Sequence, residues 1–263
     1  MIRYILAIAL AASLSAAFAE EPLPKELPKE QETAAIRSAE VTGLAIYRHD
    51  HAAAVATDAV MKLRAFRKDK RVNGWLTEEQ QDQIVVTFID KTPAALYRVT
   101  VSKEGAAGPV TALESPAQLT AYESGAATAR SAALASGIQP CSKSYNSVVL
   151  PSADQSGKNW MVYLLPGTTK NNVVPIGGTY RVETSGANVV GQRGFTRTCI
   201  ALQTDPRAVG LMITHLLDPV PTEAHVFWSL WAKKPIYVAT PPNGTVWAVE
   251  GNRIRLVERK AED

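Results

Sequence analysis

Residues 179–192, TYRVETSGANVVGQ, decide the fold, because two short β-rich runs flank the dipeptide Ser185-Gly186. Val, Thr and Tyr are enriched in strands, and glycine allows the backbone conformation of a tight turn. A connection this short joins antiparallel neighbours, since parallel strands need a long crossover. The stretch therefore predicts a hairpin within an antiparallel sheet.

The same pattern extends over residues 138–263, where short β-rich runs alternate with connectors such as residues 241–244 (PPNG) and Gly251-Asn252. We expect this region to form a C-terminal β-meander, either an antiparallel sheet or an open barrel. Besides the runs at 179–184 and 189–192, the predicted strands are residues 147–150, 160–165, 198–202, 210–217, 225–231, 236–239, 246–249 and 253–257.

Residues 33–137 combine helices with a hairpin. The Ala-rich residues 33–66 are predicted to be mainly helical, with Asp50 capping a second helix, although residues 41–47 also suit a strand. Residues 84–89 (IVVTFI) and 95–101 (ALYRVTV) predict a hairpin across Asp90-Lys-Thr-Pro. The fold class is therefore α+β, and residues 33–137 and 138–263 form one domain or two.

A capped helix is predicted to begin at residues 115–118, SPAQ. Ser115 suits the N-cap, Pro116 suits the first helical position, and Gln118 closes a capping box. Gly137 is predicted to end the helix as its C-cap. The apolar stripe of this helix consists of Leu119, Tyr122, Ala126, Ala129 and Ala133.

Residues 1–19 have the pattern of a secretory signal peptide, with Arg3, an apolar run and a small-x-small site that predicts cleavage after Ala19. An uncleaved anchor that scaffolds an inner-membrane complex is the alternative, but residues 4–19 fall short of the roughly 20 that span a bilayer. Residues 20–32, EEPLPKELPKEQE, predict an extended tether. We expect a periplasmic or secreted protein with no transmembrane span after cleavage.

Charge is nearly balanced over the chain. The formal net charge is +3, and it becomes +2 when the leader is removed with its single Arg. Such a balance argues against nucleic-acid binding, which needs a basic face. The densest basic segment, residues 64–71 (RAFRKDKR), is predicted to be a solvated helix end, and contact with anionic lipid headgroups is the alternative.

The two cysteines, Cys141 and Cys199, predict a structural disulfide. Exported proteins meet an oxidising compartment, and the spacing fits no metal motif. A catalytic thiol or a metal-binding pair is the alternative. In the chain-entropy model the bond stabilises the fold by about 4 kcal/mol.

Common catalytic motifs are missing from the sequence, including the G-x-S-x-G elbow, the P-loop, H-E-x-x-H and C-x-x-C. Two histidine groups remain. His49-Asp50-His51 lies in Ala-rich sequence and is interpreted as a solvated helix cap. We expect no cofactor and no metal.

The second histidine group lies in residues 214–225, THLLDPVPTEAH, which are predicted to join two antiparallel strands. One register places His215 opposite His225 on one face, whereas a shift of one residue separates them. A metal centre would then take its third ligand from Glu223 or Asp218. The favoured interpretation is a hairpin whose polar side chains satisfy backbone groups.

The aromatic side chains of the C-terminal region are the candidate ligand-binding residues if they are exposed, and core residues if they are not. Overall we expect an exported, non-catalytic binding module whose partner is an envelope protein or a glycan. The alternative is a metal-dependent envelope hydrolase that uses His215, Glu223 and His225. The aromatic candidates are Trp228, Trp231, Tyr237 and Trp247.

Overall fold

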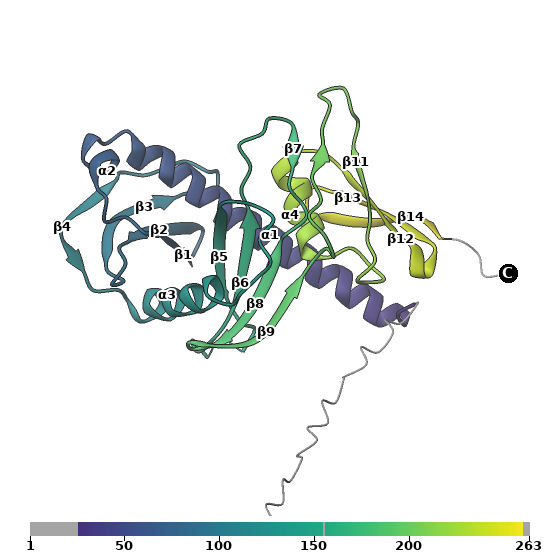
Figure 1. Cartoon of the computed structure of the whole chain (residues 1–263), viewed down its shortest axis with the longest axis horizontal. Helices are drawn as coiled ribbons and strands as arrows, with labels where there is room; N and C mark the ends of the chain where they lie inside the picture. Colours follow the sequence, from purple (N-terminus) through teal and green to yellow (C-terminus); the bar gives the residue numbers. More distant parts are fainter. Residues whose placement is uncertain (1–25, 155, 260–263) are drawn as a thin grey trace, which may run out of the picture.

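One long helix, α1 (Lys29–Met61), runs along the molecule and contacts all three of its larger sheets (Figure 1). This computed structural model describes residues 26–154 and 156–259, so the predicted signal peptide, its cleavage position and residues 20–25 of the tether lie outside the described residues. The last residues of the predicted tether, from Lys29, are already helical. A helix of 33 residues is about 50 Å long at its usual rise.

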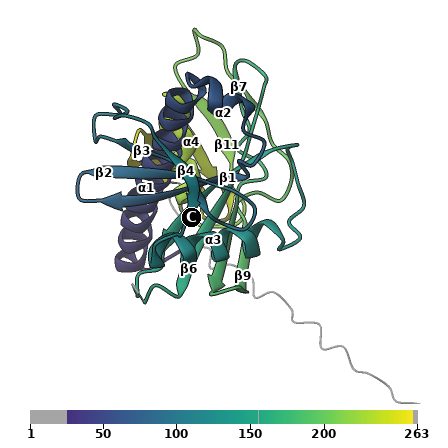
Figure 2. The ribbon, with the colours of Figure 1, turned by 90° about the vertical axis from the view of Figure 1, so that its left-hand side faces the viewer.

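The first sheet has the strand order β1-β2-β3-β4 and holds the predicted hairpin as β2 and β3. Its bounds are β1 (Gly74–Gln80), β2 (Gln83–Ile89), β3 (Ala95–Val101) and β4 (Thr111–Ala117). Seen from this end of the molecule, the sheet lies between α1 and α3 (Ala121–Leu134) (Figure 2). Val86 and Phe88 pack with the C-terminal half of α1, whereas Leu76 and Ile89 pack with α3.

The predicted helix of residues 115–137 forms as α3, but it begins five residues later than predicted. Ser115 and Pro116 extend β4, which pairs with β3. Thr120 is the N-cap instead, since its hydroxyl accepts the Glu123 N–H and the Glu123 carboxylate accepts the Thr120 N–H. The sequence contains two successive capping-box patterns, residues 115–118 and 120–123, and the first is not used because most of its residues belong to β4.

The central sheet has the order β5-β6-β8-β9 and confirms the hairpin of residues 179–192 as β8 and β9. Both of its faces are covered. Val148 and Tyr163 face the core shared with α1 and α4, and Val149 and Val162 face α3. The bounds are β5 (Tyr145–Pro151), β6 (Asn159–Pro166), β8 (Tyr180–Ser185) and β9 (Asn188–Gly194).

The third sheet has the order β11-β12-β13-β14, and two predictions about it were wrong. Residues 225–231 form no strand but lie in helix α4 (Glu223–Ala232). Because this helix is the crossover, β11 pairs with β12 in parallel and not antiparallel. The strands are β11 (Leu211–Thr214), β12 (Ile236–Thr240), β13 (Thr245–Glu250) and β14 (Arg253–Arg259).

Four short elements complete the described chain. The basic segment starts with α2 (Arg64–Lys68). Of the predicted strand at residues 198–202, only Leu202 is in a strand, β10 (Leu202–Gln203), which pairs with β7 (Val173–Val174). A 3-10 turn, η1 (Pro241–Asn243), occupies the predicted Pro-Pro-Asn-Gly connector.

Helices α1 and α4 cross at Gly43, inside the segment for which a strand was also considered. A Cβ atom at Gly43 would lie 2.5 Å from Cβ of Val226 and 2.8 Å from the carbonyl oxygen of Glu223. Glycine lowers helix stability by about 1 kcal/mol relative to alanine. It is found here because only a hydrogen atom fits between the two helices.

The predicted disulfide is confirmed between Cys141 and Cys199, whose Cα atoms are 5.3 Å apart. Gly177 and Gly178 lie against it, and a Cβ on Gly178 would come within 2.8 Å of Cys141 Sγ. The glycine pair thus allows the bridged segments to approach. Helices and open sheets confirm the α+β class, with no closed barrel within residues 26–154 and 156–259. None of the helices described is both long and apolar enough to cross a bilayer.

Candidate functional site

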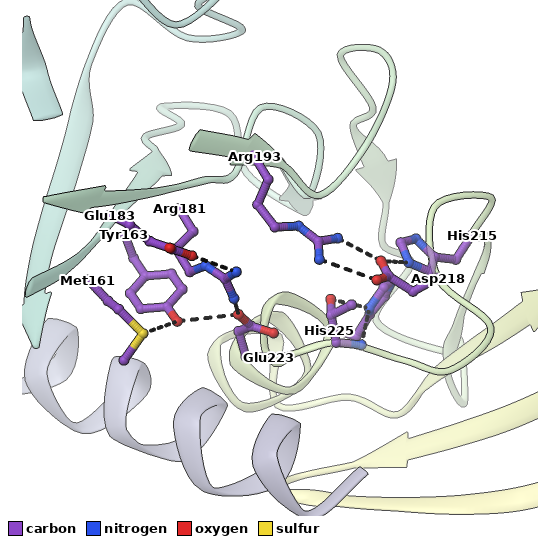
Figure 3. Close-up of polar contacts among 10 residues, drawn as sticks. Met161, Tyr163, Arg181, Glu183, Arg193, His215, Asp218, Glu223 and His225 are labelled. Atoms are coloured by element: carbon purple, nitrogen blue, oxygen red, sulfur yellow. Dashed lines mark hydrogen bonds and ion pairs between the residues drawn. The ribbon is translucent and has the colours of Figure 1, made fainter. Parts of the chain in front are cut away.

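The crossover from β11 to α4 brings His215 and His225 together, although the predicted hairpin between them does not exist. His215 follows β11, and His225 lies in the first turn of α4. Their rings meet edge to face, with centroids 4.7 Å apart (Figure 3). The helix thus produces the proximity that was predicted only for one strand register.

His215 belongs to an ion-pair chain that ends on the central sheet. Its Nε2–H donates to Asp218 Oδ2 at 2.9 Å, and Arg193 of β9 donates to both oxygens of the same carboxylate. Burial raises the pKa of Asp218, but the hydrogen bonds from His215 and Arg193 outweigh it and hold that pKa well below its usual range. Asp218 is therefore ionised at neutral pH, and its ion pair with Arg193 connects the crossover loop to β9.

His225 acts as part of the helix cap. Its Nδ1 accepts the backbone N–H of Thr222 at 3.0 Å, so Nδ1 carries no proton. The side chain is fully enclosed, and burial holds the pKa of His225 well below 6.5. A neutral imidazole in this position accepts the N–H of the N-cap residue, Thr222, as the carboxylate of glutamate does in an ordinary capping box.

Glu223 points away from the two histidines. Its Oε1 accepts from Arg181 at 2.9 Å and from the Tyr163 hydroxyl at 3.3 Å (Figure 3). Burial, together with the Glu223 charge, raises the pKa of Tyr163 far above its usual range. The three side chains of the hydrolase interpretation therefore do not converge. Among the described residues, no group of three or more His, Cys, Asp or Glu is arranged to hold a metal ion.

Arg181 and Arg193 are direct cross-strand partners on β8 and β9. Like charges in this position repel unless each has its own counterion. Arg181 pairs with Glu223, and Arg193 pairs with Asp218. The two ion pairs connect the central sheet to the crossover loop and to the first turn of α4, which is a structural role.

His49-Asp50-His51 is not a solvated cap, because it lies in the middle of α1 and its first two side chains are buried. His49 Nδ1 bonds Thr77 Oγ1 of β1 at 2.8 Å, and Asn146 of β5 donates to Asp50 Oδ1 at 2.9 Å. Burial lowers the pKa of His49 to about 4 and raises that of Asp50. These two neighbours connect α1 to two different sheets, while His51 is exposed and stacks on Tyr47.

The predicted aromatic candidates separate into core and surface. Trp228 and Trp247 are buried, and their indole N–H groups donate to Thr179 and Thr240 respectively. Tyr237 is half-buried on β12. Trp231, at the end of α4, is 40% exposed and is therefore the member of the set most open to a ligand.

Trp231 is held in place from beneath. Its ring meets that of Trp228 edge to face, with centroids 5.3 Å apart. Trp228 is fixed by its hydrogen bond to Thr179, whose hydroxyl donates in turn to the carbonyl of Ile176. An exposed ring with such support keeps its orientation when a ligand arrives, so little ordering entropy is lost on binding.

A hollow of about 340 Å³ lies at Trp231. Residues 168–172 (TTKNN) line it together with Val173, Val174, Thr204, Trp231 and Ala232, and none of these described residues is acidic. The loop is braced, because Thr168 Oγ1 accepts the Lys170 N–H and the Asn172 carbonyl accepts the Thr204 N–H. One aromatic ring beside amides, hydroxyls and one ammonium is typical of a site for a polar ligand.

Sequence reasoning identified Trp231 but not the loop that faces the same hollow. The run of Thr, Lys and Asn at residues 168–172 indicates a turn, and nothing in it specifies which surface it borders. The pairing of β7 with β10, through residues about thirty apart, places it there.

Part of the positive charge of the basic segment, residues 64–71, is neutralised within the protein. Arg71 pairs with Asp69, and the Tyr97 hydroxyl donates to the same carboxylate. Hydrogen bonds from Arg71 hold the pKa of Asp69 well below its usual range. Contact of this segment with lipid headgroups stays a prediction.

No known protein family and no curated protein matches the chain. Among solved structures, the comparison finds the Bacillus megaterium YpeB C-terminal domain, with 16% sequence identity and a TM-score of 0.18. The match covers 54% of this chain and 65% of that one. A likeness this weak supports no statement about function, so the interpretation of the site rests on its own geometry.

Proposed function

We propose that this chain is an exported, non-catalytic binding module that holds a glycan of the cell envelope on the ring of Trp231. The observation that supports the proposal most directly is the braced, exposed indole beside a polar hollow. An indole offers a flat apolar face to the C–H groups of a sugar ring, and the neighbouring amides and hydroxyls suit its hydroxyl groups.

Export is supported by the disulfide, which persists in oxidising compartments and is rare in the cytosol. Expression of the full chain with its own leader, followed by N-terminal sequencing of the exported protein, tests this part. We expect the sequence to begin at Glu20. A chain that begins at Met1 and sediments with membranes would support the anchored alternative instead.

The binding proposal is tested by isothermal titration calorimetry of the exported protein against a panel of soluble neutral and acidic oligosaccharides. We expect Trp231→Ala to weaken the binding of any ligand found by about tenfold or more, which corresponds to at least 1.4 kcal/mol. Met212→Ala, an exposed apolar residue on β11, is the matched control and should bind like the parent. Failure of the whole panel to bind, or equal binding by Trp231→Ala, would overturn the proposal.

A further inference from the structure

Strand β11 has an open side along the edge of the third sheet. It is the terminal strand of that sheet, and among the described residues only β12 pairs with it. The N–H groups of Leu211 and His215 donate to carbonyl groups at β12. Backbone groups of alternate residues point to opposite sides of a strand, so those of Met212 and Thr214 face away from the sheet. Groups in this position can pair with the extended backbone of another chain.

The opposite edge of the same sheet, β14, is closed by helix α1. Glu40 accepts the Ile254 N–H at 2.8 Å and also pairs with Arg253. Charged residues follow each other along β14, and these disfavour pairing with another chain. Two edge strands of the other sheets are protected in different ways, since β4 contains Pro116 and the β8–β9 pairing contains a bulge.

The β11 edge carries no such protection. Residues 209–217, VGLMITHLL, contain no Asp, Glu, Lys or Arg. Leu211 and Ile213 face the core, whereas Met212 on the outer face is 64% exposed and Leu216 is 44% exposed. An uncharged edge that exposes large apolar side chains is typical of a strand that pairs with another chain.

The β11 segment is complementary to itself in one antiparallel register. With a twofold axis at Ile213, Met212 lies opposite Thr214 of the second copy, and Gly210 lies opposite Leu216 of the second copy. Each pair on the outer face then joins a large side chain to a small one. A shift by two residues would instead place Met212 opposite itself or opposite Leu216.

Gly210 gives this register a further contact. A Cβ atom there would lie 2.9 Å from the ring of Tyr237, so the ring covers the glycine closely. Leu216 of the second copy would therefore lie beside the Tyr237 ring. Each Met212–Thr214 pair would exchange two backbone hydrogen bonds, as the hydrogen-bonded pairs of an antiparallel ladder do.

We infer that two copies of this chain associate through antiparallel pairing of their β11 strands, which joins two four-stranded sheets into one continuous sheet. The contact is isologous and closes at a dimer, because the same strand is used on both sides of the twofold axis. It does not depend on the glycan site proposed at Trp231.

Sedimentation velocity of the exported full chain over a range of concentrations tests the inference. We expect a reversible dimer, since a short strand gives a small interface. Thr214→Lys places an ammonium group on the exposed edge and should weaken dimerisation by about tenfold or more. Val190→Lys, at a 65% exposed position on the edge strand β9, is the matched control and should dimerise like the parent. Far-UV circular dichroism checks that both variants are folded.

Oxidative cross-linking tests the register. In a hydrogen-bonded antiparallel pair the Cα atoms are about 5.5 Å apart, which a disulfide can bridge, whereas diagonal neighbours are about 7–8 Å apart. The double variant Met212→Cys, Thr214→Cys should therefore form a covalent dimer on non-reducing electrophoresis. Met212→Cys alone and Thr214→Cys alone should remain largely uncross-linked.

A chain that stays monomeric at every concentration would overturn the inference. A dimer that Thr214→Lys leaves intact, or that Val190→Lys weakens instead, would also overturn it by placing the contact on another surface. Cross-linking of a single-cysteine variant as readily as of the double variant would overturn the proposed register.

Discussion

Buried histidines make the stability of this protein depend on pH at the scale of single residues. His49 and His225 are 3% and 1% exposed, and burial lowers the pKa of both. The folded state keeps them neutral, whereas the unfolded chain protonates them near pH 6.5. Their contribution to the free energy of unfolding is therefore complete above pH 6.5 and is lost as the pH falls below that value. For His49 the loss continues until the pH reaches its folded pKa of about 4.

For His49 the loss from pH 7.5 to pH 5 is about 2 kcal/mol of unfolding free energy, out of about 3 kcal/mol for the full shift. Urea unfolding at the two pH values measures it, and His49→Gln should flatten the dependence by that amount. Among the charged groups near the ring, Glu79 lies 4.0 Å from His49 Nε2, and the charge of Arg48 lowers the pKa of His49 further. Burial raises the pKa of Asp50, so its contribution to the pH dependence of stability has the opposite sign. An unchanged pH dependence in His49→Gln would show that the imidazole does not titrate as described.

The role of His49 and Asp50 could not be predicted from their own neighbourhood. Their partners, Thr77 and Asn146, lie 28 and 96 residues away in the sequence. An Ala-rich helix gives a weak hydrophobic pattern, and α1 is covered from more than one side, so no single apolar stripe marks its buried face. Trp231 was predictable as a candidate, but its exposure depended on the helix that replaced the expected strand.

At the scale of elements, the α1–α4 crossing depends on Gly43. We expect Gly43→Ala to destabilise the protein by about 1–3 kcal/mol, as overpacking does, despite the better helix propensity of alanine. Denaturant unfolding measures the change. Val41→Ala, exposed on the same helix, is the control and should stay within about 0.5 kcal/mol of the parent. A stabilised Gly43→Ala would show that the helices can separate without cost.

The start of α3 gives a second prediction at this scale. Thr120→Ala removes the hydroxyl that accepts the Glu123 N–H and should cost about 1 kcal/mol. Ser115→Ala, in the capping box predicted from the sequence, is exposed on β4 and should be close to neutral. Comparison of the two unfolding free energies shows which capping box starts the helix. A larger loss in Ser115→Ala than in Thr120→Ala would mean that the helix begins at residue 115.

Most elements were predictable because turn residues and β-rich runs are local signals, as in the β8–β9 and β2–β3 hairpins. Residues 225–231 (HVFWSLW) failed for a definite reason. A short apolar run has the same composition in a buried strand and in a buried helix, and α4 is buried on nearly all sides from Glu223 to Ser229. The mistaken expectation that this sheet is wholly antiparallel followed from that one error, since a helix between β11 and β12 makes their pairing parallel.

At the scale of the whole molecule, α1 contributes to two of the three hydrophobic cores. Ala39 and Ile46 pack in the core of the C-terminal sheets, and Ala56 and Val60 pack in that of the first sheet. We propose that residues 33–137 and 138–263 unfold as one unit, since the core of residues 138–263 includes Ala39 and Ile46 of α1 and is incomplete without that helix. Calorimetry should give a single transition whose calorimetric and van't Hoff enthalpies agree, and two resolved transitions would contradict this.

The disulfide joins the segment before β5 to the segment between β9 and β10, and so closes a loop around the central sheet. With a separation of 58 residues, the chain-entropy model predicts that its loss costs about 4 kcal/mol. The Cys141→Ser, Cys199→Ser double variant tests this by denaturant unfolding and leaves no free thiol to exchange. Reductant should destabilise the parent by a similar amount and leave the double variant unchanged. Gly177 and Gly178 lie close to the bridged segments. A loss far above about 4 kcal/mol would therefore mean that the disulfide also organises the packing of the folded state around them.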